Sequence, residues 1–201
     1  MLAAGEGHTV LLRSDGRVVS YGTNVCGQRN IPEAGEEAGQ CYVQVAAGAG
    51  HTVLLRSDGR VVVCGEAAFG QNDVPEPSPG TAYVQVAAGR SHAVLLQSDG
   101  RVVECGGSCG HLPVLGDGAV VVQVAGGGSH SVLLCADGQA IACGDNFFGQ
   151  CDIPCAEPGV AYKRAAAGGA HSVLLRSDGR AVACGDNACG QCSIPELGEG
   201  Q

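Results

Sequence analysis

Residues 51–59 read HTVLLRSDG, and this stretch returns nearly unchanged along the chain. Closely similar stretches begin at four other histidines, His8, His92, His130 and His171. The five histidines are 38 to 43 residues apart, a period typical of propeller blades and of helical arrays. Asp58-Gly59 separates two runs rich in β-formers, and this pattern predicts a two-residue hairpin turn with both central residues at positive φ. We therefore expect a β-hairpin in each repeat.

A third strand is predicted before each hairpin. It reads YVQVAAG from Tyr42 and Tyr83 and VVQVAGG from Val121, with Val and Gln alternating at the period of a strand. Residues 53–55 are apolar in succession, so both faces of that strand are expected to be covered by neighbouring sheets. A glycine every few residues and the lack of a 3.6-residue apolar period exclude helical repeats. The sequence predicts an all-β fold, a β-propeller built from five repeats of about 40 residues.

Composition narrows the classes of partner. The net charge is −9, aromatic residues make up 3% and the single lysine is Lys163, so the chain lacks the basic patch that nucleic-acid binding requires. The longest apolar runs, such as AVVVQVA from Ala119, are far shorter than the roughly 20 residues of a membrane-spanning helix. No secretory signal precedes the first repeat. We expect no nucleic-acid or membrane partner and a cytoplasmic or nuclear location.

The repeat resembles a known family. The string AAGxxHTVLLRSDGRVVxCGxNxxGQxxIP, seen at residues 46–75 and 166–195, is similar to the repeat of the regulator of chromosome condensation family of β-propellers. The compact blade with its GQ exit is also similar to that of propeller-type β-lactamase inhibitory proteins. The resemblance implies a single repeat domain, 1–201. Its five blades are expected at approximately 1–43, 44–84, 85–122, 123–163 and 164–201.

The ends of the chain leave two architectures open. Residues 1–5 read as the second half of a YVQVAAG strand and are expected to complete the last blade, which would close the ring. Family propellers have seven blades, however, so the five repeats form either a closed five-bladed ring or an open arc of a longer propeller.

Candidate reactive groups do not form an active site. His, Ser or Thr and Asp recur five times at equivalent positions, whereas a catalytic triad needs one local, asymmetric set. We predict no catalytic residues, no cofactor and no metal, because neither Cys105, Cys109 and His111 nor Cys189 and Cys192 supply the four ligands that zinc prefers. Four cysteines at equivalent strand ends, Cys64, Cys105, Cys143 and Cys184, are interpreted as small buried hydrophobes. We expect no native disulfide among the twelve cysteines.

The loops that follow each strand-ending glycine vary between repeats, as TNVCGQ, EAAFGQ, GSCGH, DNFFGQ and DNACGQ. All three phenylalanines of the chain lie in them, which is typical either of interface anchors or of packing against the next blade. The third loop is shortened and lacks the GQ exit. The partner-binding candidates are Asn24, Phe69, Asn146, Phe147, Phe148 and Asn187.

These observations favour a non-catalytic scaffold that binds another protein through the loops of one propeller face. Two alternatives follow from the family resemblance: a guanine-nucleotide exchange factor for a small GTPase, or a propeller module of a larger ubiquitin-ligase-type multidomain protein. No functional residue of these relatives can be assigned to a position in this chain, because the loops do not match residue by residue.

Overall fold

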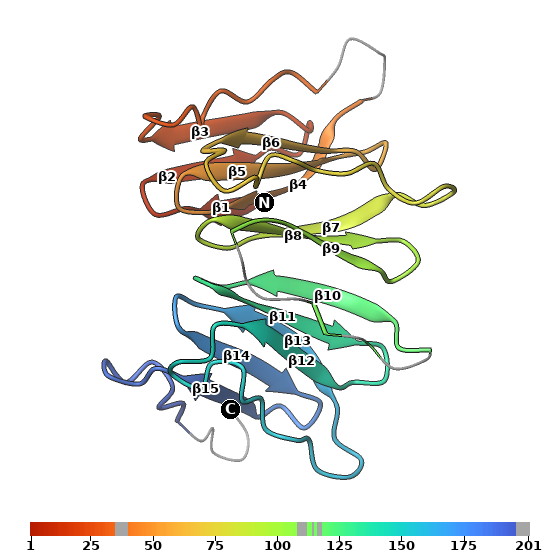
Figure 1. The fold of residues 1–201 in the computed structure, drawn as a ribbon, viewed down its shortest axis with the longest axis vertical. Coiled ribbons are helices and arrows are strands. Elements are labelled where there is room, and N and C mark those ends of the chain that lie inside the picture. The colour runs from red at the N-terminus through yellow and green to blue at the C-terminus, as the bar shows by residue number, and fades with distance from the viewer. Residues whose placement is uncertain (35–39, 108–111, 114, 116–117, 196–201) are drawn as a thin grey trace. The chain divides into compact units, whose positions relative to one another are not determined.

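The structure is a computed structural model that describes residues 1–34, 40–107, 112–113, 115 and 118–195. In these residues the chain forms fifteen strands in five three-stranded antiparallel sheets and no helix, so the expected all-β fold is confirmed (Figure 1). The strands are β1 (Leu2–Ala4), β2 (His8–Leu12), β3 (Val18–Gly22), β4 (Tyr42–Ala47), β5 (His51–Arg56), β6 (Val61–Gly65), β7 (Tyr83–Ala88), β8 (His92–Gln97), β9 (Val102–Gly106), β10 (Val121–Gly126), β11 (His130–Cys135), β12 (Ala140–Gly144), β13 (Tyr162–Ala167), β14 (His171–Arg176) and β15 (Ala181–Gly185).

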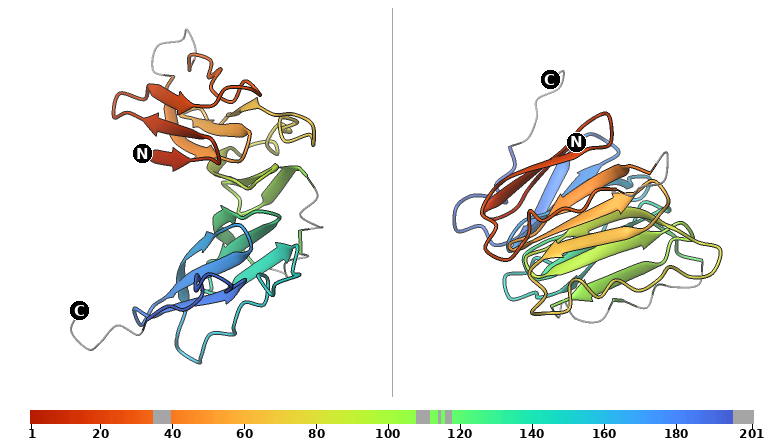
Figure 2. Two further views of the ribbon diagram at one scale, coloured as in Figure 1. Left: turned by 90° about the vertical axis from the view of Figure 1, so that its left-hand side faces the viewer. Right: turned by 90° about the horizontal axis from the view of Figure 1, so that it is seen from above.

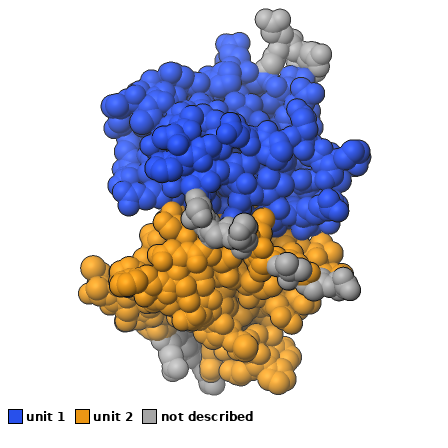
Figure 3. Space-filling view, viewed as in Figure 1, with its two compact units in different colours: residues 1–108 blue, residues 109–201 orange. Residues whose placement is uncertain are grey.

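The chain divides into two compact units, Met1–Ser108 and Cys109–Gln201 (Figure 3). Unit 1 contains the sheets β1–β3, β4–β6 and β7–β9, and unit 2 contains β10–β12 and β13–β15. We call each sheet a blade and number the blades 1 to 5 in chain order. The choice between a closed ring and an open arc stays open.

Each blade contains one copy of the repeat. The central strand of each blade begins at the repeated histidine, and the first and third strands pair with it on either side. Blades 2 to 5 begin at Tyr42, Tyr83, Val121 and Tyr162, each two residues before the predicted start of its repeat. The division into repeats at those boundaries stays a prediction.

The hairpin turn differs from the expected two-residue type. Arg56 N–H donates to Arg60 O and Gly59 N–H donates to Arg56 O, so the loop has three residues, Ser57, Asp58 and Gly59. Gly59 has a φ of +78°. Every residue with positive φ in the described ranges is a glycine, so the φ of Asp58 is not positive as the predicted turn requires. The reason is local: Asp58 Oδ1 accepts the N–H of Arg60, which favours a type I turn followed by a left-handed glycine.

Residues 2–4 do not complete the last blade. β1 pairs with β2 in the first blade, with Leu2 opposite Leu11 and Ala4 opposite Thr9, and it is the strand next to the N-terminus in Figure 2. That expectation was wrong because this segment precedes His8 as residues 42–47 precede His51, and a three-residue link joins each first strand to its own central strand.

Apolar cores fill the joints between blades of the same unit, where the sheets stack face to face (Figures 1 and 2). In unit 1, Val10 of blade 1 packs with Val45 and Leu54 of blade 2. In unit 2, Val132 and Leu134 of blade 4 pack with Leu174 of blade 5. The central strand of blade 2 is therefore covered on both faces, which explains its run of consecutive apolar residues.

Candidate interaction site at the exit loops

We call the segment that follows the third strand of a blade its exit loop. Four exit loops are described, at residues 23–30, 66–73, 145–152 and 186–193. The shortened third loop, with Cys109 and His111, lies largely outside the described residues.

A side-chain amide bridges three of these loops internally. In blade 4, Asn146 Nδ2 donates to Asp152 Oδ1 over 2.8 Å, and Asn146 Oδ1 accepts the N–H of Cys151 over 2.7 Å. Asn24 makes the same two contacts with Asn30 and Arg29, at 2.9 and 2.8 Å. Asn187 bonds Ser193 and Cys192 in the same way. These three predicted candidates therefore hold the loop conformation.

The side chain of the glutamine in the GQ pair makes hydrogen bonds to the backbone at the tip of its loop. Gln150 is buried; its Oε1 accepts the N–H of Phe148 over 2.9 Å, and its Nε2 donates to Asp145 Oδ2 over 2.8 Å. Gln71 likewise accepts the N–H of Phe69 over 3.0 Å. The backbone of each phenylalanine next to the glycine is thus fixed by a buried amide, which pre-organises the tip.

The tips themselves are apolar and exposed. Phe147 is 83% exposed, Phe69 56% and Phe148 50%. These rings therefore face solvent and do not pack against the next blade, which was the alternative. The Phe147 and Phe148 rings meet edge to face with centroids 4.9 Å apart. Val25 occupies the position of Phe147 in the first exit loop and is 88% exposed. Sequence reasoning missed Val25 because it followed aromatic residues; aligning the loops on their GQ pair would have found it.

The exit loop is attached to the next blade of its unit by a three-residue latch. In unit 2, His130 Nε2 lies 2.9 Å from Ser172 Oγ, and that hydroxyl donates to Gln150 O over 2.8 Å. Because the hydroxyl's one proton goes to the carbonyl, the imidazole Nε2–H must be the donor to Ser172. Burial lowers the pKa of His130, so the ring is neutral at physiological pH.

In unit 1 the same latch joins blades 1 and 2. His8 Nε2 lies 2.8 Å from Thr52 Oγ1, which donates to Gln28 O over 2.8 Å. His8 and His130 therefore connect neighbouring blades of one unit through the hydroxyls of Thr52 and Ser172.

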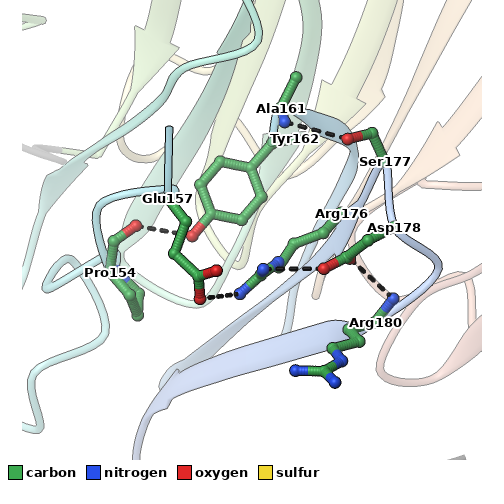
Figure 4. A network of polar contacts seen from close by, with 8 residues as sticks. All are labelled: Pro154, Glu157, Ala161, Tyr162, Arg176, Ser177, Asp178 and Arg180. Carbon is green, nitrogen blue, oxygen red and sulfur yellow. Dashed lines mark hydrogen bonds and ion pairs between the residues drawn. The ribbon is translucent and has the colours of Figure 1, made fainter. Parts of the chain in front are cut away.

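The opposite end of the blade, at the Ser-Asp-Gly hairpin, carries charged groups that bond to one another (Figure 4). Arg176 Nη2 donates to Asp178 Oδ2 over 2.8 Å, and its Nη1 lies 3.3 Å from Glu157 Oε1. Beside them the Tyr162 hydroxyl donates to Pro154 O, which fixes the end of the preceding connection. Here the charged side chains form internal pairs, unlike the apolar tips of the exit loops.

The eleven cysteines of the described residues form no disulfide. Burial raises the pKa of Cys64 and of Cys105 to about 11, which keeps both protonated at neutral pH. Within the described residues, no group of three or more His, Cys, Asp or Glu side chains is placed to hold a metal ion. No helix of these residues is long and apolar enough to cross a membrane.

Stacked three-stranded blades with repeated exit loops define a repeat protein of the β-propeller class. The regulator of chromosome condensation (RCC1) repeat matches residues 2–28, 42–71, 121–150 and 163–191, which is more than half of the chain. The chain belongs to the RCC1 repeat family, as the sequence resemblance predicted. Blade 3 lies outside the matched ranges although β7–β9 form the same sheet as the others. Its exit loop lacks the GQ pair of the other repeats.

Solved structures confirm the fold. The similar chains include Prp20p of Saccharomyces cerevisiae, studied for its binding to Gsp1p and histones (TM-score 0.81, 24% identity, 97% of this chain and 59% of that chain). Human WBSCR16 (TM-score 0.75, 23% identity, 92% and 61%) and the CRINKLY WD40 ectodomain of the Arabidopsis thaliana receptor kinase ACR4 (TM-score 0.73, 22% identity, 92% and 71%) are also similar. This chain spans about three fifths of the length of the first two. No curated protein sequence matches significantly.

Proposed function

We propose that this chain is a non-catalytic scaffold that binds another protein through the tips of its exit loops. The observation that carries the proposal is the exposure of four apolar side chains at the loop tips, Val25, Phe69, Phe147 and Phe148. The backbones of these loops are held by hydrogen bonds to side-chain amides within the same loop. Exposed aromatic side chains on a pre-organised backbone are the anchors that dominate protein interfaces, since little conformational entropy is lost when they bind.

The charge around the aromatic pair supports a protein partner over nucleic acid. The exit loops of unit 2, residues 145–152 and 186–193, contain Asp145, Asp152 and Asp186 and neither Lys nor Arg. Carboxylates at this site repel phosphate and favour a partner surface that carries positive charge beside an apolar pocket. The absence of nucleic-acid binding stays a prediction, which a filter-binding assay at low salt would check.

Alanine substitution of the tips tests this function. Partners are captured on the immobilised chain and identified by mass spectrometry, and the affinity of each purified partner is then measured for Phe147→Ala and Phe148→Ala. We expect each to weaken binding by roughly 1 to 3 kcal/mol while the melting temperature is unchanged, because both rings are exposed. Arg13→Ala, on an exposed hairpin, is the matched control and should bind normally. A partner lost only with Arg13→Ala would move the site to the hairpin end.

Guanine-nucleotide exchange on a small GTPase is the second candidate, and membership of the RCC1 repeat family is what favours it. It is tested by the release of a fluorescent guanine nucleotide from a panel of small GTPases. Accelerated release that Phe69→Ala or Phe147→Ala abolishes would join the two functions, and no acceleration with any GTPase would remove this one.

A third alternative is that the chain works as a module of a larger ubiquitin-ligase-type protein. No described residue bears on it. The complete reading frame that encodes this sequence would decide it directly.

A further inference from the structure

Every described joint within a unit is built from the same two sheet faces. We call the face with the first and third apolar residues of the central strand the front face, and the face with the second one the back face. In unit 1, Val10 on the front face of blade 1 packs against Leu54 on the back face of blade 2. In unit 2, Leu134 on the front face of blade 4 packs with Leu174 on the back face of blade 5. In each of these joints the front face of one blade packs on the back face of the next.

The back face of blade 1 is exposed. Leu11 is 37% exposed, whereas Leu54 and Leu174, its equivalents in blades 2 and 5, are 0% exposed. Leu2 is 63% exposed, whereas Val45 at the same position of blade 2 is 2% exposed. Tyr21 adds a further exposed ring on the third strand of the blade. An apolar face of this kind, elsewhere covered by a sheet, marks an interaction surface.

The front face of blade 5 is exposed as well. Leu175 is 40% exposed, whereas Leu55 and Leu134, its equivalents in blades 2 and 4, are 3% and 4% exposed. His171 is half-buried, although His51 and His130 are fully buried. A methyl group built at Gly179 would meet nothing within 4 Å, whereas at Gly59 it would meet Ala82 of the following blade at 2.5 Å.

Each of these two exposed faces carries half of a latch. His171 on blade 5 stands where His8 and His130 stand, and Gln191 supplies the carbonyl equivalent to those of Gln28 and Gln150. Thr9 on blade 1 stands where Thr52 and Ser172 accept an imidazole N–H. The two halves are therefore complementary as hydrogen-bond donor and acceptor groups.

We propose that the front face of blade 5 in one copy of this chain packs on the back face of blade 1 in a second copy. The partner fits because it repeats the joint already present in each unit, with an apolar core and a latch from His171 to Thr9. The contact is heterologous, since two different surfaces meet, so copies add head to tail. This surface is separate from the exit-loop tips, and the proposal does not rest on the proposed function.

A glutamine clamp that two of the internal joints contain is missing from this contact. Gln44 Nε2 donates to Val86 O and its Oε1 accepts the N–H of Val86, which clamps blade 2 to blade 3. Gln123 clamps Ala165 in the same way. Blade 5 has Arg164 at this position, which donates but cannot accept. The contact between copies therefore lacks the two hydrogen bonds that such a glutamine makes between blades 2 and 3 and between blades 4 and 5.

The test is sedimentation velocity of the full chain over a concentration series. The parent should form species larger than a monomer as concentration rises. Leu11→Asp and Leu175→Asp each place a carboxylate on one of the two faces and should weaken association at least tenfold without loss of the β-sheet circular dichroism. Val25→Asp changes an exposed loop tip away from both faces and is the matched control, expected to associate as the parent does.

Mixing the two face variants distinguishes this geometry from any symmetric one. Leu11→Asp retains an intact blade 5 front face, and Leu175→Asp retains an intact blade 1 back face, so an equimolar mixture should form a dimer and nothing larger. A parent that stays monomeric throughout, as when the faces are covered within one copy, would overturn the proposal. So would face variants that associate like the parent, or a mixture that stays monomeric.

Discussion

The two joints of unit 1 are alike at the hairpin end and differ at the exit-loop end. At the hairpin end, a methyl group built at Gly16 would meet Cys41 at 2.4 Å and one at Gly59 would meet Ala82 at 2.5 Å, so both turns press on the following blade. At the exit-loop end, Thr52 completes the latch of the first joint. The second joint has Ala93 at the equivalent position, which has no hydroxyl.

The missing hydroxyl leaves a polar group without compensation. His51 is fully buried, and neither of its ring nitrogens has a hydrogen-bond partner among the described residues. Burial lowers the pKa of His51 to about 4, although the backbone of His92 opposes this shift. Both joints nevertheless pack an apolar core, which teaches that the blades are held together mainly by apolar burial and that the latch adds to it.

Disrupting the contact at the hairpin end, which both joints of unit 1 have, should cause the largest loss of stability. Gly59→Val forces a β-branched residue to positive φ and drives its side chain into Ala82. We expect a loss of about 2 to 4 kcal/mol in the free energy of unfolding, measured by urea denaturation. Gly16→Val, against Cys41, should lose a similar amount.

Gly179→Val is the matched control for the steric part of this loss. Its φ is +84°, but a methyl group there would meet nothing within 4 Å. The loss should be confined to backbone strain, about 1 to 2 kcal/mol. Equal losses at Gly59 and Gly179 would mean that the contact with the next blade contributes nothing.

Acid should weaken the second joint next most strongly. The pKa of His51 is about 4 in the folded state and near 6.5 in the unfolded state, so between these values the unfolded chain binds a proton that the native chain does not. Stability from this group is complete above pH 6.5 and falls as the pH drops towards 4, by up to about 3 kcal/mol.

The measurement compares urea denaturation of the parent and of His51→Leu at pH 7.5 and pH 4.5. The variant should lose less stability on acidification, since it lacks the buried base. Identical losses would show that His51 is solvated or paired in solution.

Removing the latch from the first joint tests its contribution directly. Thr52→Val keeps the size of the side chain but leaves His8 Nε2 and Gln28 O buried without their shared partner. We expect a loss of about 1 to 3 kcal/mol, read from the shift in the denaturation midpoint. An unchanged midpoint would mean that water replaces the hydroxyl at no cost.

Much of this architecture was predictable from local sequence. The strand positions follow from the period of the histidines, from alternation in segments such as residues 42–47, and from glycines at the turns. The length of the turn was mispredicted because the prediction considered only the Asp-Gly pair and not the residue before it. Ser57 belongs to the loop, its N–H donating to Cys41 O, and only the pairing of the strands reveals this.

The candidate site was predictable in its location but only partly in its residues. Asn146 and Phe147 are neighbours in one variable loop. The side-chain amide of Asn146 makes hydrogen bonds within that loop, whereas the ring of Phe147 is exposed to solvent. This difference depends on the three-dimensional structure and cannot be seen in the sequence. The latch escaped sequence reasoning because its parts lie in different blades. An alignment of the five repeats would still have displayed Ala93 among the hydroxyl residues that follow the other histidines.

Restoring the latch in the second joint should have the smallest effect, and the opposite sign. In Ala93→Ser the introduced hydroxyl can accept from His51 Nε2 and donate to Gln71 O, as Ser172 does for His130 and Gln150 in unit 2. A satisfied buried hydrogen bond contributes about 0.5 to 1.5 kcal/mol, so the free energy of unfolding should rise by that amount.

A double-mutant cycle shows whether the gain comes from the latch. In a His51→Leu background the hydroxyl of Ala93→Ser has no imidazole partner, so the gain should vanish or become a loss. Persistence of the gain without His51 would assign it to the bond with the Gln71 carbonyl alone. A loss in the parent background would mean that the second joint has repacked around Ala93 and no longer has room for a hydroxyl. The two joints would then differ in backbone spacing as well as in one side chain.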